Sequence, residues 1–190
     1  TKVTDDPLRP YYQSIINTLS DTRYQLDNRF VSLTLLVDRG ANNPNGRFLA
    51  RSQQSEYSSL ATLLGDIDDR VLVILGNPGS GKSTLLRRLQ LEMAWAQLEN
   101  PIGNLPFFVQ LNGYLDEISP YEWLEQEWHI QHPDHLPFRT YFESGKVLLL
   151  LDGLNEIPHQ DSQDYRRRIR LWQTFLSQTY SRGNQVLFSC

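Results

Sequence analysis

The chain has 190 residues, of which 39% are hydrophobic and 21% charged, a composition typical of a globular protein with one sizeable core. Its formal net charge of -4 argues against a protein that mainly coats nucleic acid, because phosphate binding needs an excess of Lys and Arg. The single cysteine, Cys190, excludes an intrachain disulfide and suits a reducing compartment. We therefore expect a cytoplasmic protein without a membrane span.

The two ends of the sequence suggest a piece of a longer protein. Residue 1 is not Met, and the chain stops at Cys190 inside a strand-like run. The first ten residues are polar and lack the apolar stretch of a signal peptide. We expect further parts of the protein to lie beyond this sequence.

The first third of the chain has a loose pattern. Apolar residues at helical spacing predict a helix over 11–20, and a β-branched and aromatic run predicts a strand over 30–37. A loop is expected at 40–46 and a short helix within 55–64. We interpret residues 1–65 as a helical and extended segment that leads into the main domain.

From residue 66 onward the pattern becomes regular. Short apolar strands are expected at 71–75, 107–111, 147–151 and 186–189. They alternate with helices expected at 82–99, in pieces within 121–144, and at 164–180. This alternation predicts an α/β fold of three layers, with a mostly parallel sheet covered on both faces. We expect residues 66–190 to form this domain, truncated at its C-terminal end.

The strongest chemical signal follows the first of these strands. The stretch Gly76-Asn77-Pro78-Gly79-Ser80-Gly81-Lys82-Ser83 matches the pattern G-x-x-x-x-G-K-[ST] between an apolar strand and a helix. The N–H groups of such a loop, together with the helix N-terminus, form a concave site for phosphate. We expect Lys82 to reach the β- and γ-phosphates and Ser83 to bind Mg²⁺. Thr84 is expected to contact the phosphate chain.

A second motif, which contains acidic residues, supplies the metal ligand that a metal-bound triphosphate also needs. The apolar run 147–151 ends at Asp152, at the strand end where parallel sheets bind their ligands. We expect Asp152 to hold Mg²⁺ through a water molecule. In many P-loop ATPases the general base directly follows the metal-binding Asp, but here that position is Gly153, which cannot accept a proton. The candidate general base is therefore Glu156, four residues past Asp152. The two motifs predict a P-loop NTPase that binds Mg²⁺ and ATP, with GTP as the less favoured nucleotide.

The two motifs together resemble one protein family. The stretches 76–84 (GNPGSGKST) and 148–157 (LLLLDGLNEI) are similar to the nucleotide motifs of the NACHT family, part of the STAND class of signal-transduction NTPases. The second family motif ends in two acids. Glu156 matches the second of them, and Asn155 stands in place of the first. An amide cannot act as a base, which leaves Glu156 alone in that role.

The resemblance carries implications for the whole molecule. It implies a switch in which nucleotide state controls oligomerisation, with self-association through the NTPase and with effector and sensor domains outside this sequence. It also implies that the strand at 186–189 lies between the strands that carry the glycine loop and Asp152. A sensor residue for the γ-phosphate is then expected directly after Cys190.

Two other protein classes share the glycine loop. A small-molecule kinase would need an acceptor pocket and a lid that carries arginines, and the sequence has no clear lid. A nucleic-acid-stimulated motor or initiator ATPase would need a more basic surface than this composition provides. A requirement for a second substrate or for nucleic acid would distinguish these classes from the switch.

Three further groups of side chains are interpreted as structural. Histidines around Pro133, without the i, i+4 spacing of helical zinc motifs, are expected in an exposed loop: His129, His132 and His135. A basic run is expected on a solvated helix face, with a nucleic-acid patch or an intersubunit contact as alternatives: Arg166, Arg167, Arg168 and Arg170. Three tryptophans are expected to pack rather than to stack on adenine: Trp95, Trp123 and Trp128.

Overall fold

A computed structural model describes residues 6–20, 60–66, 68–100, 103–115 and 118–190 of the chain. The strand expected at 30–37 and the loop expected at 40–46 lie outside these residues. The α-helices are α1 (Arg9–Leu19), α3 (Leu60–Asp66), α4 (Lys82–Glu99), α5 (Pro120–Gln131), α6 (Phe138–Glu143) and α7 (Ser162–Ser181). The strands are β1 (Val71–Ile74), β2 (Leu105–Gln110), β3 (Val147–Asp152) and β4 (Gln185–Ser189), and two 3₁₀ turns are η2 (Leu111–Gly113) and η3 (Leu154–Glu156).

The strands form one sheet in the order β1-β4-β3-β2, and each pair of neighbours is parallel. The expectation that the strand at 186–189 lies between the strand of the glycine loop and the strand of Asp152 is therefore confirmed. The described sheet is wholly parallel, where the sequence predicted a mostly parallel one. All its strands point their carboxyl ends to the same edge, which is where ligands bind in such sheets.

The strands are apolar on both faces, as a parallel sheet between helix layers requires. All six residues of β3 are buried. Alternate residues face different cores: Val147, Leu149 and Leu151 join one cluster, whereas Leu148 and Leu150 join the other. Both clusters continue through β2 and β4, so two cores hold one sheet in place.

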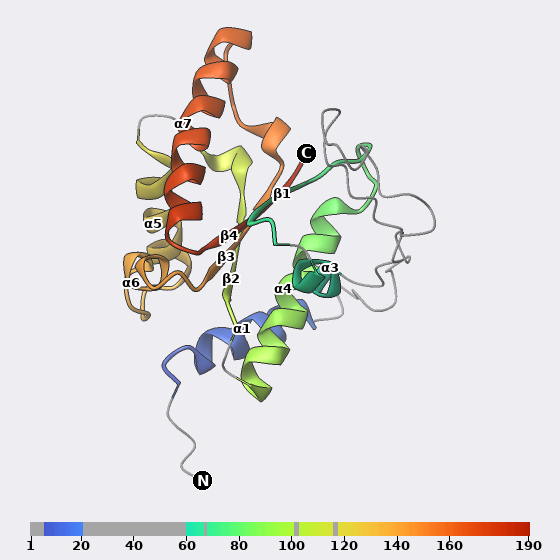
Figure 1. The fold of residues 1–190 in the computed structure, drawn as a ribbon, viewed down its shortest axis with the longest axis vertical. Helices are drawn as coiled ribbons and strands as arrows, with labels where there is room; N and C mark the ends of the chain where they lie inside the picture. The colour runs from blue at the N-terminus through green and yellow to red at the C-terminus, as the bar shows by residue number, and fades with distance from the viewer. Residues whose placement is uncertain (1–5, 21–59, 67, 101–102, 116–117) are drawn as a thin grey trace.

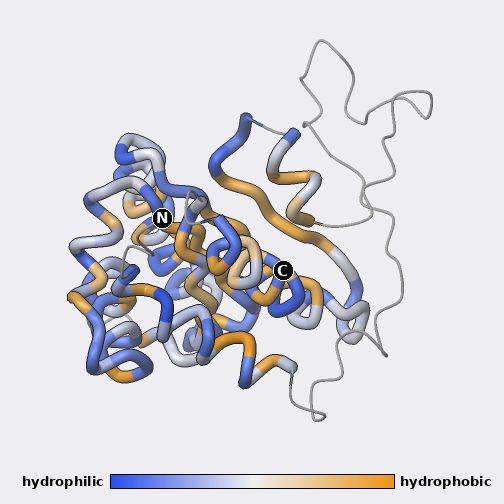
Figure 2. Tube along the Cα trace, turned by 90° about the horizontal axis from the view of Figure 1, so that it is seen from below, coloured by the Kyte–Doolittle hydropathy of each residue, from blue (hydrophilic) through white to orange (hydrophobic). Residues whose placement is uncertain are grey.

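Helices cover both faces of the sheet (Figure 1), which confirms the three-layer α/β architecture. Helices α3 and α4 lie on one side, and α5, α6 and α7 lie on the other. Orange and blue alternate around the helical turns in Figure 2, as expected where one side of each helix is buried. No helix in the described part of the chain combines the length and apolar character that a membrane span requires.

An aromatic cluster joins α1 to the sheet. We give this name to five rings that contact one another: Tyr11, Phe107, Trp128, His132 and Phe138. The Tyr11 hydroxyl also donates a hydrogen bond of 2.6 Å to the carbonyl oxygen of Pro106 in β2. Helix α1 therefore shares the core of the sheet, and the division of the chain at residue 65 stays a prediction.

The expectation of an exposed histidine loop is met only in part. His129 is exposed but lies in the last turn of α5 rather than in a loop, and His132 and His135 follow the helix but are half-buried. The His132 ring lies 4.7 Å from the rings of Tyr11 and Trp128, measured between centroids. Burial, with a smaller effect from neighbouring His135, lowers the pKa of His132 to about 4. The sequence could not reveal this because α1 supplies the covering surface from more than a hundred residues away.

The three tryptophans do not share one environment. Trp123 and Trp128 are buried in the core as expected, at 6% and 1% exposure. Trp95 is 50% exposed, so its expected packing role is wrong. It lies on the outer side of α4, away from the buried leucines of that helix.

Candidate nucleotide-binding site

The glycine loop connects β1 to α4, as the sequence predicts, and residues 75–81 are all exposed. Gly79 and Gly81 have φ values of 76° and 85°, in the region that side-chain-bearing residues rarely adopt. A Cβ atom at either glycine would meet nothing within 4 Å. The space beside the loop backbone is therefore open to a ligand.

The N-terminus of α4 adds hydrogen-bond donors to this loop. The first N–H groups of a helix have no partner within the helix, and Gly81 at the N-cap provides no side-chain bond to them. Lys82, Ser83 and Thr84 form the first turn of this 18-residue helix. Uncapped donors at the positive end of a helix dipole fit a phosphate group.

The Lys82 side chain folds back against the loop. Its ammonium group donates hydrogen bonds to the carbonyl oxygens of Gly76, at 2.7 Å, and Asn77, at 3.0 Å. The Asn77 carbonyl oxygen also accepts from the Ser80 N–H at 3.1 Å. The positive charge is thus held within the loop, where it can meet a bound phosphate.

The two sequence motifs meet at the end of β3. The Ser83 hydroxyl donates a hydrogen bond of 2.9 Å to Oδ1 of Asp152, which lies 69 residues away in the sequence. Asp152 is the last residue of β3 and is 7% exposed. A hydroxyl and a carboxylate are the hard oxygen ligands that Mg²⁺ prefers, so this pair fits the ion. Among the described residues no cluster of three or more acidic, His or Cys side chains could hold a metal. Mg²⁺ in a nucleotide site needs none, because phosphate and water complete its coordination.

A third polar residue at this edge, Ser189, was not identified from the sequence. It is the last residue of β4, the strand between β1 and β3, and it is 2% exposed. Its hydroxyl donates to Asp152 Oδ1 at 2.6 Å and accepts from the Gly153 N–H at 2.8 Å. The sequence does show a polar residue at the end of an apolar strand, but only the strand order shows that this residue lies beside Asp152.

Glu156 is brought back toward the end of β3 by a tight turn. Its N–H donates a hydrogen bond of 2.8 Å to the Gly153 carbonyl oxygen. Gly153 has a φ of 78°, and a Cβ atom there would lie 3.0 Å from Oε2 of Glu156. The Glu156 side chain is exposed and packs over the residue that directly follows Asp152. Glycine at 153 is therefore what permits this approach.

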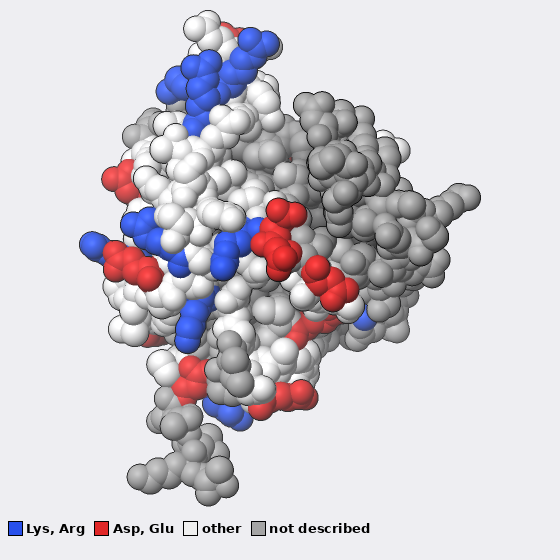
Figure 3. All heavy atoms as spheres, viewed as in Figure 1, with Lys and Arg blue, Asp and Glu red and all other residues white. Residues whose placement is uncertain are grey.

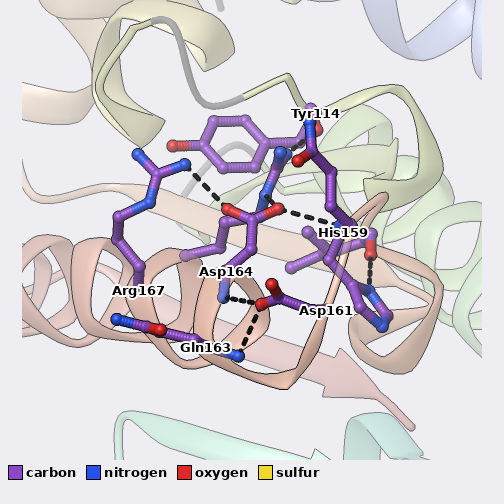
Figure 4. A network of polar contacts seen from close by, with 9 residues as sticks. Tyr114, His159, Asp161, Gln163, Asp164 and Arg167 are labelled. Atoms are coloured by element: carbon purple, nitrogen blue, oxygen red, sulfur yellow. Dashed lines mark hydrogen bonds and ion pairs between the residues drawn. The ribbon is translucent and has the colours of Figure 1, made fainter.

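A polar network holds the chain that follows Glu156 (Figure 4). Asp161 caps α7 by accepting hydrogen bonds of 2.8 Å from the N–H groups of Gln163 and Asp164. The His159 ring contacts the Ile157 carbonyl oxygen through Nδ1 at 2.7 Å. The segment that carries Glu156 thus runs between two anchored points, the end of β3 and the start of α7.

Asp164 lies in the first turn of α7 and pairs with two arginines of that helix, of which Arg168 reaches the turn after β2. Its carboxylate accepts from Arg167 at 2.7 Å and from Arg168 at 3.1 Å (Figure 4). The Arg167 hydrogen bond is the main cause that lowers the pKa of Asp164 to about 2, and the Gln160 N–H and Arg168 add to it. Arg168 also approaches the Tyr114 carbonyl oxygen at 3.5 Å.

The expected solvated face of α7 needs one correction. Arg168 is 8% exposed, because it points into the core toward η2 rather than outward. Arg166, Arg167 and Arg170 are exposed as expected. Basic side chains gather over the N-terminal part of α7 in Figure 3.

A protein-family model matches the part of the chain that contains the sheet. The family model of the NACHT domain matches residues 70–190, which is more than half of the chain. The matched range starts one residue before β1 and contains all four described strands, the glycine loop and the Asp152 segment. Comparison with curated proteins gave no match.

Proposed function

Because the chain belongs to the NACHT family of STAND-type P-loop NTPases, we propose that it is a Mg²⁺-dependent switch that binds and hydrolyses ATP. Family membership makes it a nucleotide-binding NTPase module. The preference for ATP over GTP, the roles of single residues, the cytoplasmic location and the signalling output are our further assignments. Residues 66–190 would form the NTPase and residues 1–65 the segment that leads into it.

One observation carries the proposal: the 2.9 Å hydrogen bond from the Ser83 hydroxyl to Asp152 Oδ1. It joins the first turn of α4 to the end of β3, so both halves of the expected site face one point. Mg²⁺ coordination by a nucleotide requires this meeting of a hydroxyl and an acid. An accidental glycine turn would provide no reason for the two motifs to be in contact.

Each polar group of the site takes a separate role. The N–H groups of residues 76–84 other than Pro78, which has none, would bind phosphate oxygens, and Lys82 would turn from the loop carbonyls to the β- and γ-phosphates. Ser83 and Asp152 would hold Mg²⁺, Asp152 through water. The ion, when bound, neutralises negative charge on the phosphate oxygens.

Glu156 is assigned as the general base. Its carboxylate is exposed and lies over Gly153, so a water molecule can reach both it and the end of β3. Asn155, also exposed, cannot accept a proton in its place. Glu156 would orient the attacking water and take its proton.

The output of the switch is inferred from the family. Self-association is typical of NACHT proteins, and we propose that the bound nucleotide controls it in this protein. Effector and sensor domains would lie outside this sequence. Arg166 and Arg170 of α7 are exposed, as a contact with another subunit would require.

The decisive experiment measures binding of fluorescent ATP and ADP, with Mg²⁺ and with EDTA, to the protein and to its Lys82→Ala variant. We expect Lys82→Ala to weaken binding by about tenfold to a hundredfold, the value of a lost charge-assisted hydrogen bond to phosphate. Lys146→Ala is the matched control, because Lys146 is exposed and lies just before β3, at the other end of that strand. Competition with unlabelled GTP measures the base preference.

The same proteins test the two other classes. Phosphate release that needs neither nucleic acid nor a second substrate supports the switch. Turnover that appears only with nucleic acid would indicate a motor, and turnover only with a phosphate acceptor would indicate a kinase. Equal nucleotide affinity in the folded Lys82→Ala variant and the unsubstituted protein would refute the proposal.

A further inference from the structure

Ser189 has a position in the sheet that no other described side chain shares. It ends β4, the strand between the one that leads into the glycine loop and the one that ends in Asp152. Its side chain is 2% exposed. It contacts two consecutive residues at the end of β3: it donates a hydrogen bond to the Asp152 carboxylate and accepts one from the Gly153 N–H.

The direction of these two hydrogen bonds is fixed by chemistry. A serine hydroxyl carries one proton, and a backbone N–H can only donate. The Gly153 N–H therefore occupies an acceptor position on the Ser189 oxygen, at 2.8 Å. The single hydroxyl proton is then available for Asp152 Oδ1, at 2.6 Å, a distance typical of a hydroxyl that donates to a carboxylate.

This arrangement divides the two oxygens of the Asp152 carboxylate. Oδ1 accepts from both Ser83 and Ser189, and no hydrogen bond to Oδ2 is present among the described residues. If Ser83 turns to a metal ion, Ser189 is the donor that still holds Oδ1. Asp152 is mostly buried, so it has little water to replace a lost donor.

We propose that Ser189 is a positioning residue for Mg²⁺: it holds Oδ1 of Asp152 so that the carboxylate keeps one orientation toward the ion. This inference rests on the proposed nucleotide function. Groups that orient metal ligands through hydrogen bonds commonly change metal affinity by about tenfold to a hundredfold when they are removed. Ser189 is therefore expected to affect the Mg²⁺ response and not the binding of nucleotide by the glycine loop.

The test is a Mg²⁺ titration of fluorescent ATP binding to the unsubstituted protein and to Ser189→Ala. We expect Ser189→Ala to raise the Mg²⁺ concentration at half-maximal response by about tenfold to a hundredfold. ATP affinity in EDTA should stay unchanged. Ser181→Ala is the matched control, because it removes an exposed hydroxyl at the far end of α7, bonded to the Gln178 carbonyl oxygen at 2.9 Å.

A second variant separates orientation from simple support of the fold. Ser189→Cys keeps nearly the same side-chain volume but donates a weaker hydrogen bond, so its Mg²⁺ midpoint should lie between those of Ser189→Ala and the unsubstituted protein. Chemical denaturation in EDTA shows that each variant is folded under the assay conditions.

The outcomes distinguish this inference from the function on which it rests. If the unsubstituted protein shows no Mg²⁺-dependent ATP binding, the proposed function fails. If it does, and folded Ser189→Ala has the same Mg²⁺ midpoint, only the role of Ser189 is refuted. Loss of ATP binding in EDTA by Ser189→Ala would also refute it, because the hydroxyl would then support the loop rather than the metal site.

Discussion

The carboxyl-end edge of the sheet and the aromatic cluster on one of its faces are built in different ways. At the edge, the glycine loop is exposed, and the polar groups of Lys82, Ser83 and Asp152 are held by hydrogen bonds. In the aromatic cluster, Tyr11, Phe107, Trp128 and Phe138 are each 1% exposed or less. The edge lacks packing that a ligand would have to displace, whereas the cluster gains stability from the apolar area that it buries. Substitutions in the two regions should therefore affect different measurements.

The largest effect is expected at the edge, from Glu156→Gln. Loss of a general base should lower the rate of ATP hydrolysis by about a hundredfold to ten-thousandfold, while ATP affinity and the free energy of unfolding stay nearly unchanged. Steady-state phosphate release and chemical denaturation provide the two measurements. Asn155→Ala, at the neighbouring exposed position, is the control that should keep most of the activity. Full activity in Glu156→Gln would assign the base to another group.

A smaller effect, and on stability instead, is expected from Trp128→Ala. Trp128 is 1% exposed and donates a hydrogen bond of 2.9 Å from its indole nitrogen to the Leu136 carbonyl oxygen. Its truncation should lower the free energy of unfolding by about 3–5 kcal/mol. The fraction that is folded should bind ATP with nearly normal affinity.

Trp95→Ala offers the matched comparison for this measurement. Trp95 is 50% exposed, so its truncation should change the free energy of unfolding by about 0.5 kcal/mol or less. Urea denaturation followed by circular dichroism measures both variants. Equal losses in the two variants would show that the aromatic cluster is not the main source of stability.

The smallest effect is a dependence of stability on pH within the aromatic cluster. Burial lowers the pKa of His132 to about 4, below the value of 6.5 expected in the unfolded chain. Between these two pH values the unfolded chain binds the proton more readily than the folded one. The contribution of neutral His132 to the free energy of unfolding is therefore fully present above pH 6.5 and is lost as pH falls toward 4. The rings of Tyr11 and Trp128 and the neighbouring His135 surround the group.

The variant His132→Phe isolates this contribution. Urea midpoints measured from pH 7.5 to pH 4.5 should fall less steeply in His132→Phe than in the unsubstituted protein. His129→Phe changes an exposed histidine one turn earlier in α5 and should leave the slope as it was. An unchanged slope in His132→Phe would mean that another group titrates in this range.

The glycine loop, α4 and the Asp152 strand could be predicted because their signals are local. Apolar runs, a glycine pattern and helical spacing occupy adjacent residues, and α4 begins and ends at the residues predicted for it. The strand of Asp152 was predicted to within one residue for the same reason. The burial of Arg168, His132 and His135 could not be predicted, because each depends on a segment from elsewhere in the chain.

The sequence by itself determined the α/β pattern, the phosphate-binding loop and the acid at the end of β3, since backbone conformation and residue chemistry define these within a few residues. Only the tertiary structure decided which hydrogen bonds the polar groups of the site make. The strand order β1-β4-β3-β2 places Ser189 against Asp152, 37 residues away in the sequence, and Ser83 against the same oxygen from 69 residues away. Such contacts depend on how the two cores pack the sheet between its helices, and a local sequence pattern does not predict that packing.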